Sequence, residues 1–311
     1  MRMRFSVHTA VYAMGEEKAY ETFCKLRWSE TEGEPFCPRC GCVDAYRIPT
    51  RRKFKCAGCY HQYSVTSGTI FASRKMSFTD LLAAFVIFAN AVKGISALQL
   101  SRDLDCQHKT AFVLAHKIRE AMAAETKGMK LSGEVEIDGC YVGGHIRPAN
   151  LKENRIDRRL AKHQTGKRRV VFAIRQRKGR TLTFVVRNEA DGVYYANQFA
   201  EDATLLIADE AAHWDVLHQR FAIQRINHSE AYSLDGVSTN QVESFFSRLR
   251  RMVAGQHHHV SPQHLHAYAA EAAWKEDHRR LDNGSLATLA GRLAMLSPKS
   301  KDWCGYWQRA R

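Results

Sequence analysis

Three acidic residues after residue 130 have residue types and local settings that suit divalent metal ions. Asp138 stands near the end of the alternating segment 134–138, and Asp209 follows the apolar run 205–208. Glu243 lies about one turn into an expected helix. Two metal ions about 3.5–4 Å apart can activate an attacking hydroxyl and stabilise the leaving oxygen of a phosphoryl displacement. Carboxylate ligands suit Mg²⁺ or Mn²⁺, so these acids are candidates for metal-dependent phosphoryl transfer with two ions.

Each of these acids also has a purely structural explanation. Glu134 and Glu136 share a strand face with Asp138 and could be merely solvated neighbours. Asp209 could favour the start of the following helix, because carboxylates are stabilised near a helix N-terminus. Glu243 could form an ion pair with an arginine of its own helix. The spacing of the acids alone leaves the catalytic and the structural interpretations open.

A second group of chemically active residues consists of four cysteines. Cys37 and Cys40 form one CxxC pair, Cys56 and Cys59 form another, and 15 residues separate the pairs. Four sulfur ligands at this spacing close a tetrahedral shell, which predicts one structural Zn²⁺ ion in a zinc ribbon. Cys42 falls outside the pattern, and we interpret it as a spare thiol.

The charge of the chain indicates a polyanionic partner. Lys and Arg number 47 against 32 Asp and Glu, for a net charge of +15. Such a surface favours nucleic acid, because cationic side chains that neutralise phosphates release bound counterions. Residues 147–180 alone hold thirteen Lys or Arg and two acids, which predicts a DNA-tracking insertion or a solvated loop. The expected DNA contacts are Arg51, Arg52, Lys53 and Lys55 in the cysteine-rich segment, Arg158, Arg159, Lys167, Arg168 and Arg169 in the basic stretch, and Arg248 and Arg250 near the acids.

Helices and strands that could carry these groups follow from the apolar patterns. Apolar spacing in 76–124 predicts three short helices, which favours a helix-turn-helix-like DNA-binding module over a plain helical linker. From residue 134 alternating segments predict strands, and helical segments follow them, so this part of the chain is an α/β unit. The expected strands are 134–142, 168–177, 181–187 and 204–208. The expected helices are 16–28, 81–92, 95–103 and 109–122 in the first part, and 211–220, 239–253 and 262–280 in the second.

These patterns divide the chain into five regions. We expect a helical lead-in over 1–34, a zinc ribbon over 35–75, a helical DNA-binding module over 76–130, a catalytic domain over 131–285 and a C-terminal tail over 286–311.

Several motifs in this order resemble the IS1595 family of insertion-sequence transposases, in particular its ISXO2-like members. They are the zinc-ribbon blocks around the two CxxC pairs, the block 136–144 (EIDGCYVGG), Ala208-Asp209, Asn227-His228-Ser229 and the block 237–247 (VSTNQVESFFS). The resemblance covers nearly the whole chain. It implies an RNase H-like catalytic core of the DDE kind, with Asp138 on its first strand, Asp209 after its fourth and the third ligand on a later helix.

The third position of this expected triad has two candidates. Some members of the family are described with Asn in this place, and Asn240 stands three residues before Glu243. Residues three apart share a helix face, so both side chains could approach the metals. We prefer Glu243, because a carboxylate binds Mg²⁺ better than an amide. A lysine usual in the family is Arg250 here, which keeps the charge but presents it in a different geometry.

The resemblance predicts a transposase that binds the terminal inverted repeats of its element in double-stranded DNA, then cuts and joins strands. A homodimer is expected, because two ends must be brought together. No signal peptide or membrane span is expected, so the predicted location is the bacterial cytoplasm, at the nucleoid. Two alternatives stay open: an RNase H-like nuclease without strand transfer, and a non-catalytic zinc-ribbon regulator derived from a transposase.

Overall fold

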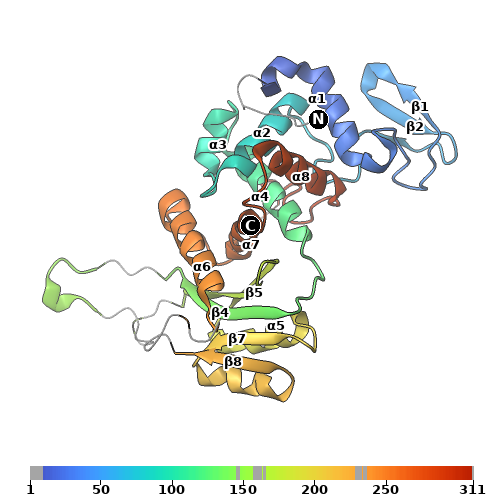
Figure 1. Cartoon of the computed structure of the whole chain (residues 1–311). Helices are drawn as coiled ribbons and strands as arrows, with labels where there is room; N and C mark the ends of the chain where they lie inside the picture. The colour runs from blue at the N-terminus through green and yellow to red at the C-terminus, as the bar shows by residue number, and fades with distance from the viewer. Residues whose placement is uncertain are drawn as a thin grey trace. The chain divides into compact units, whose positions relative to one another are not determined.

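The computed structural model describes residues 10–144, 148–156, 163, 166–227, 233 and 237–309 (Figure 1). The chain forms two compact units. The first unit combines Met1–Glu125 with Arg280–Arg311, and the second unit is Thr126–Arg279. Within the described residues, no helix has the length and apolar character that crossing a membrane requires.

A small three-stranded antiparallel sheet lies in the first unit, after α1 (Tyr12–Arg27). Its strands β1 (Ala45–Ile48), β2 (Lys53–Cys56) and β3 (Gln62–Tyr63) are adjacent in that order. Because a sheet of this size buries little surface, its core is a set of aromatic rings around the fully buried Trp28. The ring centroids of Phe54 and Tyr63 lie 5.5 Å and 6.5 Å from that of Trp28.

Four further helices complete the first unit: α2 (Phe78–Asn90), α3 (Ala97–Asp103), α4 (His108–Ala124) and α8 (Asn283–Leu296). The first three correspond to the three predicted helices. Residues 286–311, expected as a tail, contain most of α8, and α8 packs against α1, α2 and α4. Beyond α8, the ring of Trp303 stacks on that of buried His116 with centroids 4.0 Å apart. The C-terminal segment is therefore part of the first unit's core.

The second unit is built on a five-stranded sheet of order β6-β5-β4-β7-β8. β4, β5 and β6 are consecutive antiparallel neighbours, whereas β7 pairs parallel with β4 and β8 pairs parallel with β7. The expected mixed α/β architecture is confirmed, and four of these strands match predicted ones. The fifth, β8, was not predicted. The strands are β4 (Glu134–Val142), β5 (Arg169–Gln176), β6 (Thr181–Val186), β7 (Leu205–Asp209) and β8 (Ala222–Ile226).

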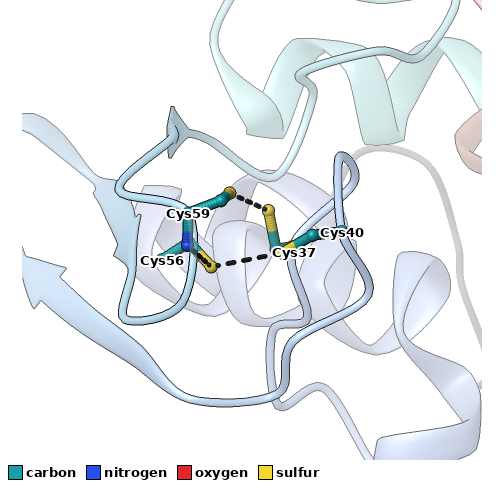
Figure 2. Close-up of side chains that lie close together, drawn as sticks. All are labelled: Cys37, Cys40, Cys56 and Cys59. Carbon is teal, nitrogen blue, oxygen red and sulfur yellow. Dashed lines mark hydrogen bonds between the residues drawn. The ribbon is translucent and has the colours of Figure 1, made fainter.

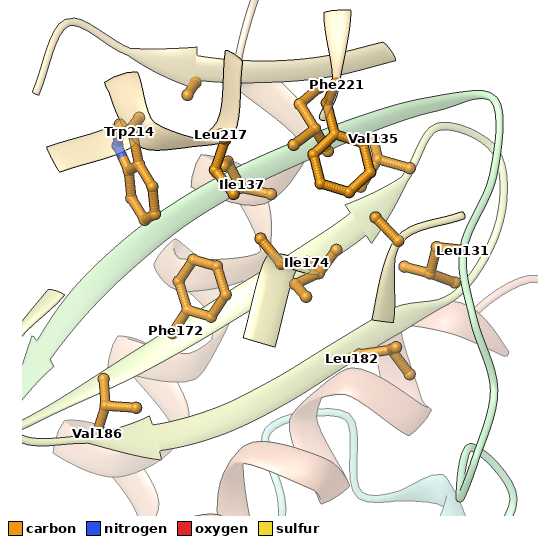
Figure 3. Packing of buried hydrophobic residues seen from close by; sticks show 14 of the residues in the cluster. Leu131, Val135, Ile137, Phe172, Ile174, Leu182, Val186, Trp214, Leu217 and Phe221 are labelled. Carbon is orange, nitrogen blue, oxygen red and sulfur yellow. The ribbon is translucent and has the colours of Figure 1, made fainter. Parts of the chain in front are cut away.

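Helical segments cover both faces of this sheet, because side chains alternate along its central strands. Val135 and Ile137 of β4 point into one core, which also contains side chains from α5 (Gly192–Phe199) and from η7 (Ala212–Gln219) (Figure 3). Cys140 and Val142 of the same strand point into a second core with α6 (Asn240–Met252) and α7 (Leu265–Asp277). The helix expected over 211–220 is the 3-10 helix η7.

A close approach between α5 and the sheet depends on a glycine. A Cβ built on Gly192 would lie 2.7 Å from a carbon of the Phe172 ring, so an added methyl group has no room. Phe172 is fully buried on β5. Gly192 therefore sets how closely the start of α5 packs on the sheet.

We predict that Gly192→Ala destabilises the second unit by about 1–3 kcal/mol, because overpacking forces shifts in a close-packed core. Gly255→Ala is the matched control, since a Cβ there meets nothing within 4 Å, and its effect should stay within about 0.5 kcal/mol. Hydrogen exchange of the β4 and β5 amides measures both. Equal stabilities for the two variants would contradict this packing argument.

Candidate active site

Asp138 and Asp209 lie on neighbouring parallel strands in matching positions. The pairing of β4 with β7 aligns Glu134 with Leu205 and Glu136 with Ile207. The last aligned pair therefore stands two residues before Asp138 on β4 and two residues before Asp209 on β7. Adjacent strands are about 4.8 Å apart, and the charge of Asp209 acts on Asp138, so the two aspartates lie close together at the carboxyl end of β7, which is where ligands bind in open α/β sheets.

The Asp209 carboxylate is held in a defined orientation. Its Oδ1 accepts a hydrogen bond from Nε1 of buried Trp214 at 2.8 Å and one from the backbone N–H of Ala211 at 3.2 Å. Asp138 Oδ1 likewise accepts the N–H of Gly139 at 2.7 Å. Because one oxygen of each carboxylate is used in this way, each keeps a second oxygen that could serve as a ligand.

Glu136 fixes the start of the helix that carries the third candidate ligand. Glu136 is completely buried, and its Oε2 accepts the backbone N–H groups of Gln241 and Val242, each at 2.9 Å. These are the N–H groups that a capping side chain normally satisfies, and Thr239 at the cap position makes no such bond. The Glu136 Oε1 accepts from Arg177 Nε at 3.0 Å. Glu136 is therefore not a solvated neighbour of Asp138, because a strand residue caps a helix that is distant in sequence.

Glu243 lies close enough to Asp138 for its charge to affect the pKa of that carboxyl. Burial raises the pKa of the Asp138 carboxyl to about 7, and the charges of Glu189, Asp209 and Glu243 add to this rise. The Gly139 N–H opposes the rise only in part. Asn240, the rival third ligand, is exposed at the first position of α6. Asp138, Glu189, Asp209 and Glu243 thus form one acidic cluster.

Glu189 is the member of the acidic cluster that the sequence did not predict. It opens a 3-10 helix, Glu189–Asp191, that follows β6. Burial and the charge of Asp209 raise its pKa. No spacing rule connects a residue after the third strand of the sheet with Asp138 on the first, so only the fold brings them together.

The four cysteines lie together as their spacing predicts (Figure 2). Cys37 Sγ is 3.6 Å from Cys59 Sγ, and Cys40 Sγ is 3.5 Å from Cys56 Sγ. All four sulfurs lie within 4.8 Å of one another. Sulfurs about 2.3 Å from a tetrahedral zinc are about 3.8 Å apart, so this arrangement fits a Zn²⁺ ion.

Backbone N–H groups donate hydrogen bonds to two of these sulfurs, which favours their thiolate form. The N–H of Cys59 donates to Cys56 Sγ at 3.4 Å, and this bond is the main reason that the pKa of Cys56 is lowered to about 6. The N–H of Arg39 donates to Cys37 Sγ at 3.4 Å. Cys42 is outside the four-sulfur group, and its thiol points to the Asp44 carbonyl at 3.7 Å.

Among the described residues, the four cysteines are the one group of three or more Cys, His, Asp or Glu whose ligand atoms all lie within 4.8 Å of one another. No three carboxylates of the acidic cluster meet this limit. The two sites therefore differ in kind: one is a tight, closed set of sulfurs, and the other is an open set of oxygens.

The basic residues expected at DNA are in varied settings. Arg51 and Lys53 are exposed on the ribbon, whereas Arg52 forms ion pairs with Glu16 and Glu17 at 3.3 Å and 2.8 Å. Lys55 lies over the ring of Tyr60.

In the second unit the residues expected to contact DNA also differ in their exposure and in the groups that they contact. The guanidinium of Arg168 lies 3.9 Å from the centroid of the Tyr141 ring, and Arg169 lines an open pocket with 261–263. Arg248 forms an ion pair with buried Glu276 at 2.9 Å. Lys167 and Arg250 are exposed. Arg158, Arg159, His228 and Ser229 lie outside the described residues.

Comparison with known families identifies the class of protein to which these two sites belong. An ISXO2-like transposase domain matches residues 130–277, and a transposase zinc-ribbon domain matches residues 14–62. The first range contains the whole acidic cluster, and the second contains all four zinc-site cysteines. The chain therefore belongs to the ISXO2-like transposases of the IS1595 family, as its motifs indicated. Searches of curated proteins and of solved structures found no match.

We predict that Cys56→Ser releases the zinc ion and unfolds the ribbon, because metal binding provides much of the folding free energy of so small a module. Zinc content by atomic emission and the near-ultraviolet circular dichroism of the aromatic core around Trp28 report the two losses. Cys42→Ser is the control and should keep one zinc ion per chain. A Cys56→Ser protein with full zinc content would contradict this assignment.

We predict that Glu136→Gln destabilises the second unit by about 1–3 kcal/mol, because an amide offers one acceptor where the buried carboxylate satisfies two helix N–H groups and Arg177. Glu134→Gln is the matched control. Glu134 is bound to the same Arg177, but its side chain is 52% exposed, so we expect a cost of at most about 1 kcal/mol. Hydrogen exchange at 241–245 measures the effect on α6. Equal protection in both variants would show that Glu136 does not hold this helix.

Proposed function

We propose that this protein is a DNA transposase that cleaves and joins DNA strands with divalent metal ions held by Asp138, Asp209 and Glu243. The observation that carries this proposal is the β4–β7 register, which brings the two aspartates together within the matched transposase domain. The proposed fold of this domain is RNase H-like. In support, the sheet has three consecutive antiparallel strands followed by two parallel ones, with Asp138 on the first strand and Asp209 at the end of the fourth.

The chemistry of the acidic cluster fits hard divalent cations. Mg²⁺ or Mn²⁺ takes oxygen ligands and keeps several positions for water and substrate. Two such ions would share the carboxylates between them, so the open spacing of the cluster suits two ions better than one. When bound, they would activate the attacking oxygen and stabilise the leaving one.

The residues of the chain supply the remaining requirements. Trp214 and Ala211 orient Asp209, and Glu136 holds the helix on which Glu243 lies. The phosphate backbone would be bound by exposed cations, for which Arg51 and Lys53 on the ribbon are candidates. A second group of candidates in the second unit is Lys167, Arg168, Arg169 and Arg250.

The proposed reaction has two steps of one kind. Water attacks a phosphodiester at the end of the element, and the freed 3′-hydroxyl then attacks target DNA. The acidic cluster serves both steps, so a protein nucleophile is not required. We propose the terminal inverted repeats as the DNA that is bound, and a dimer as the active form, because two ends react together.

Glu243 is the proposed third ligand, in preference to Asn240. Its charge acts on Asp138, which supports a position near that carboxylate. A helix capped by Glu136 holds Glu243 one turn inside its N-terminus, so its backbone is well ordered before any metal binds.

We predict that Asp209→Asn lowers the rate of cleavage of a terminal-repeat duplex in Mg²⁺ by about 10³-fold or more, with unchanged DNA binding. Glu243→Gln should act similarly, whereas Asn240→Ala should retain cleavage. Cleavage and strand transfer are followed on labelled DNA, and binding by gel shift.

Three results would contradict parts of this proposal. Wild-type cleavage in Asp209→Asn would remove the active site from this cluster. Cleavage without strand transfer in the wild-type protein would indicate a nuclease. DNA binding with no cleavage by any form would indicate a regulator.

A further inference from the structure

The backbone around Glu189 is fixed by a reciprocal cap. The side chain of Asn188 accepts from the backbone of Asp191, and the N–H of Asn188 donates to Asp191 Oδ2 at 3.1 Å. The next residue, Gly192, packs directly on Phe172 of the sheet. A carboxylate carried by so constrained a turn has a preset position before any ligand arrives.

The Glu189 side chain lies against β4 in space that a glycine leaves open. A Cβ built on Gly139 would be 2.5 Å from Glu189 Oε1 and 2.8 Å from its Cδ. The Glu189 carboxylate therefore reaches the backbone next to Asp138. Any larger residue at 139 would push it away.

This contact is costly in the absence of a cation. Carboxylates that lie close together in a protein interior repel each other. Asp209 adds a further negative charge to the same place. A neutral glutamine could occupy the same space without this repulsion, so packing against Gly139 does not explain the charge of Glu189. A divalent cation would explain it, because carboxylates that otherwise repel one another would share the cation as ligands.

We propose that Glu189 is a fourth carboxylate ligand of the divalent metal site that Asp138 and Asp209 form. This inference rests on the proposed function, since it assumes that the acidic cluster binds metal. It adds a ligand from the turn after β6, on the opposite side of β4 from β7. With acids from three separate elements around Asp138, the cluster can hold two ions instead of one.

The test is Mn²⁺ binding to the full-length, zinc-loaded protein without DNA, followed by calorimetry and by the electron paramagnetic resonance of free Mn²⁺. Glu189→Gln should weaken binding by about tenfold or more, because both ligand number and charge set the affinity for such ions. The same variant should raise the melting temperature of the metal-free protein, because it removes the repulsion. It should also reduce the rise in melting temperature that Mn²⁺ produces.

Asp191→Asn is the matched control, because Asp191 belongs to the same turn and its carboxylate accepts the cap bond from the Asn188 N–H. It should lower the melting temperature with and without Mn²⁺, and leave the Mn²⁺ affinity unchanged. A second variant, Gly139→Ala, keeps every carboxylate but displaces that of Glu189. It should weaken Mn²⁺ binding as well, and it provides the same test if Glu189→Gln does not fold.

The outcomes separate this inference from the proposed function. Wild-type affinity in Glu189→Gln or in a folded Gly139→Ala protein, together with loss of binding in Asp209→Asn, would overturn the role of Glu189 alone. Wild-type affinity in Asp209→Asn as well would overturn the metal site itself. Weaker binding in Asp191→Asn, equal to that in Glu189→Gln, would reduce Glu189 to part of a structural turn.

Discussion

The buried carboxylate of Glu136 connects two of the elements that carry the acidic cluster, β4 with Asp138 and α6 with Glu243. It lies on β4 two residues before Asp138, it accepts two backbone N–H bonds from the first turn of α6, and it accepts a third bond from Arg177. An ionised group in a protein interior is stable only when such partners replace its hydration. The same bonds fix the position of α6 on the sheet, and with it that of Glu243. The placement of the third candidate ligand thus depends on a residue that would not itself touch a metal.

Electrostatic repulsion is the opposing force in this region. Burial and three acidic neighbours raise the pKa of Asp138 to about 7, so the metal-free cluster is under strain at neutral pH. The fold tolerates this because rigid elements hold each acid: Asp209 by Trp214, and Glu189 by its capped turn. The repulsion among these carboxylates opposes the stability of the fold.

The zinc ribbon solves a different problem. Its three short strands cannot bury enough surface to fold alone, and its core consists of the rings of Trp28, Phe54 and Tyr63 beside the four sulfurs. The match to the transposase zinc ribbon begins at residue 14 and so includes most of α1. Because Trp28 follows α1 directly, the helix and the ribbon form one module. The lead-in and ribbon that we expected as separate regions share this core.

The sequence by itself determined the features that local rules control. Two CxxC pairs specify a zinc site, because each pair places two sulfurs on one ion. The alternation of apolar and polar residues predicted a strand over 134–142, and β4 has these same bounds. The motifs identified the family. Only the tertiary structure decided which side chains meet: that Glu136 caps α6, that Glu189 reaches Asp138, and that residues after 282 pack in the first unit. The physical reason is that these contacts join segments distant along the chain, whose approach depends on strand register and on glycines such as Gly139, and no local spacing contains that information.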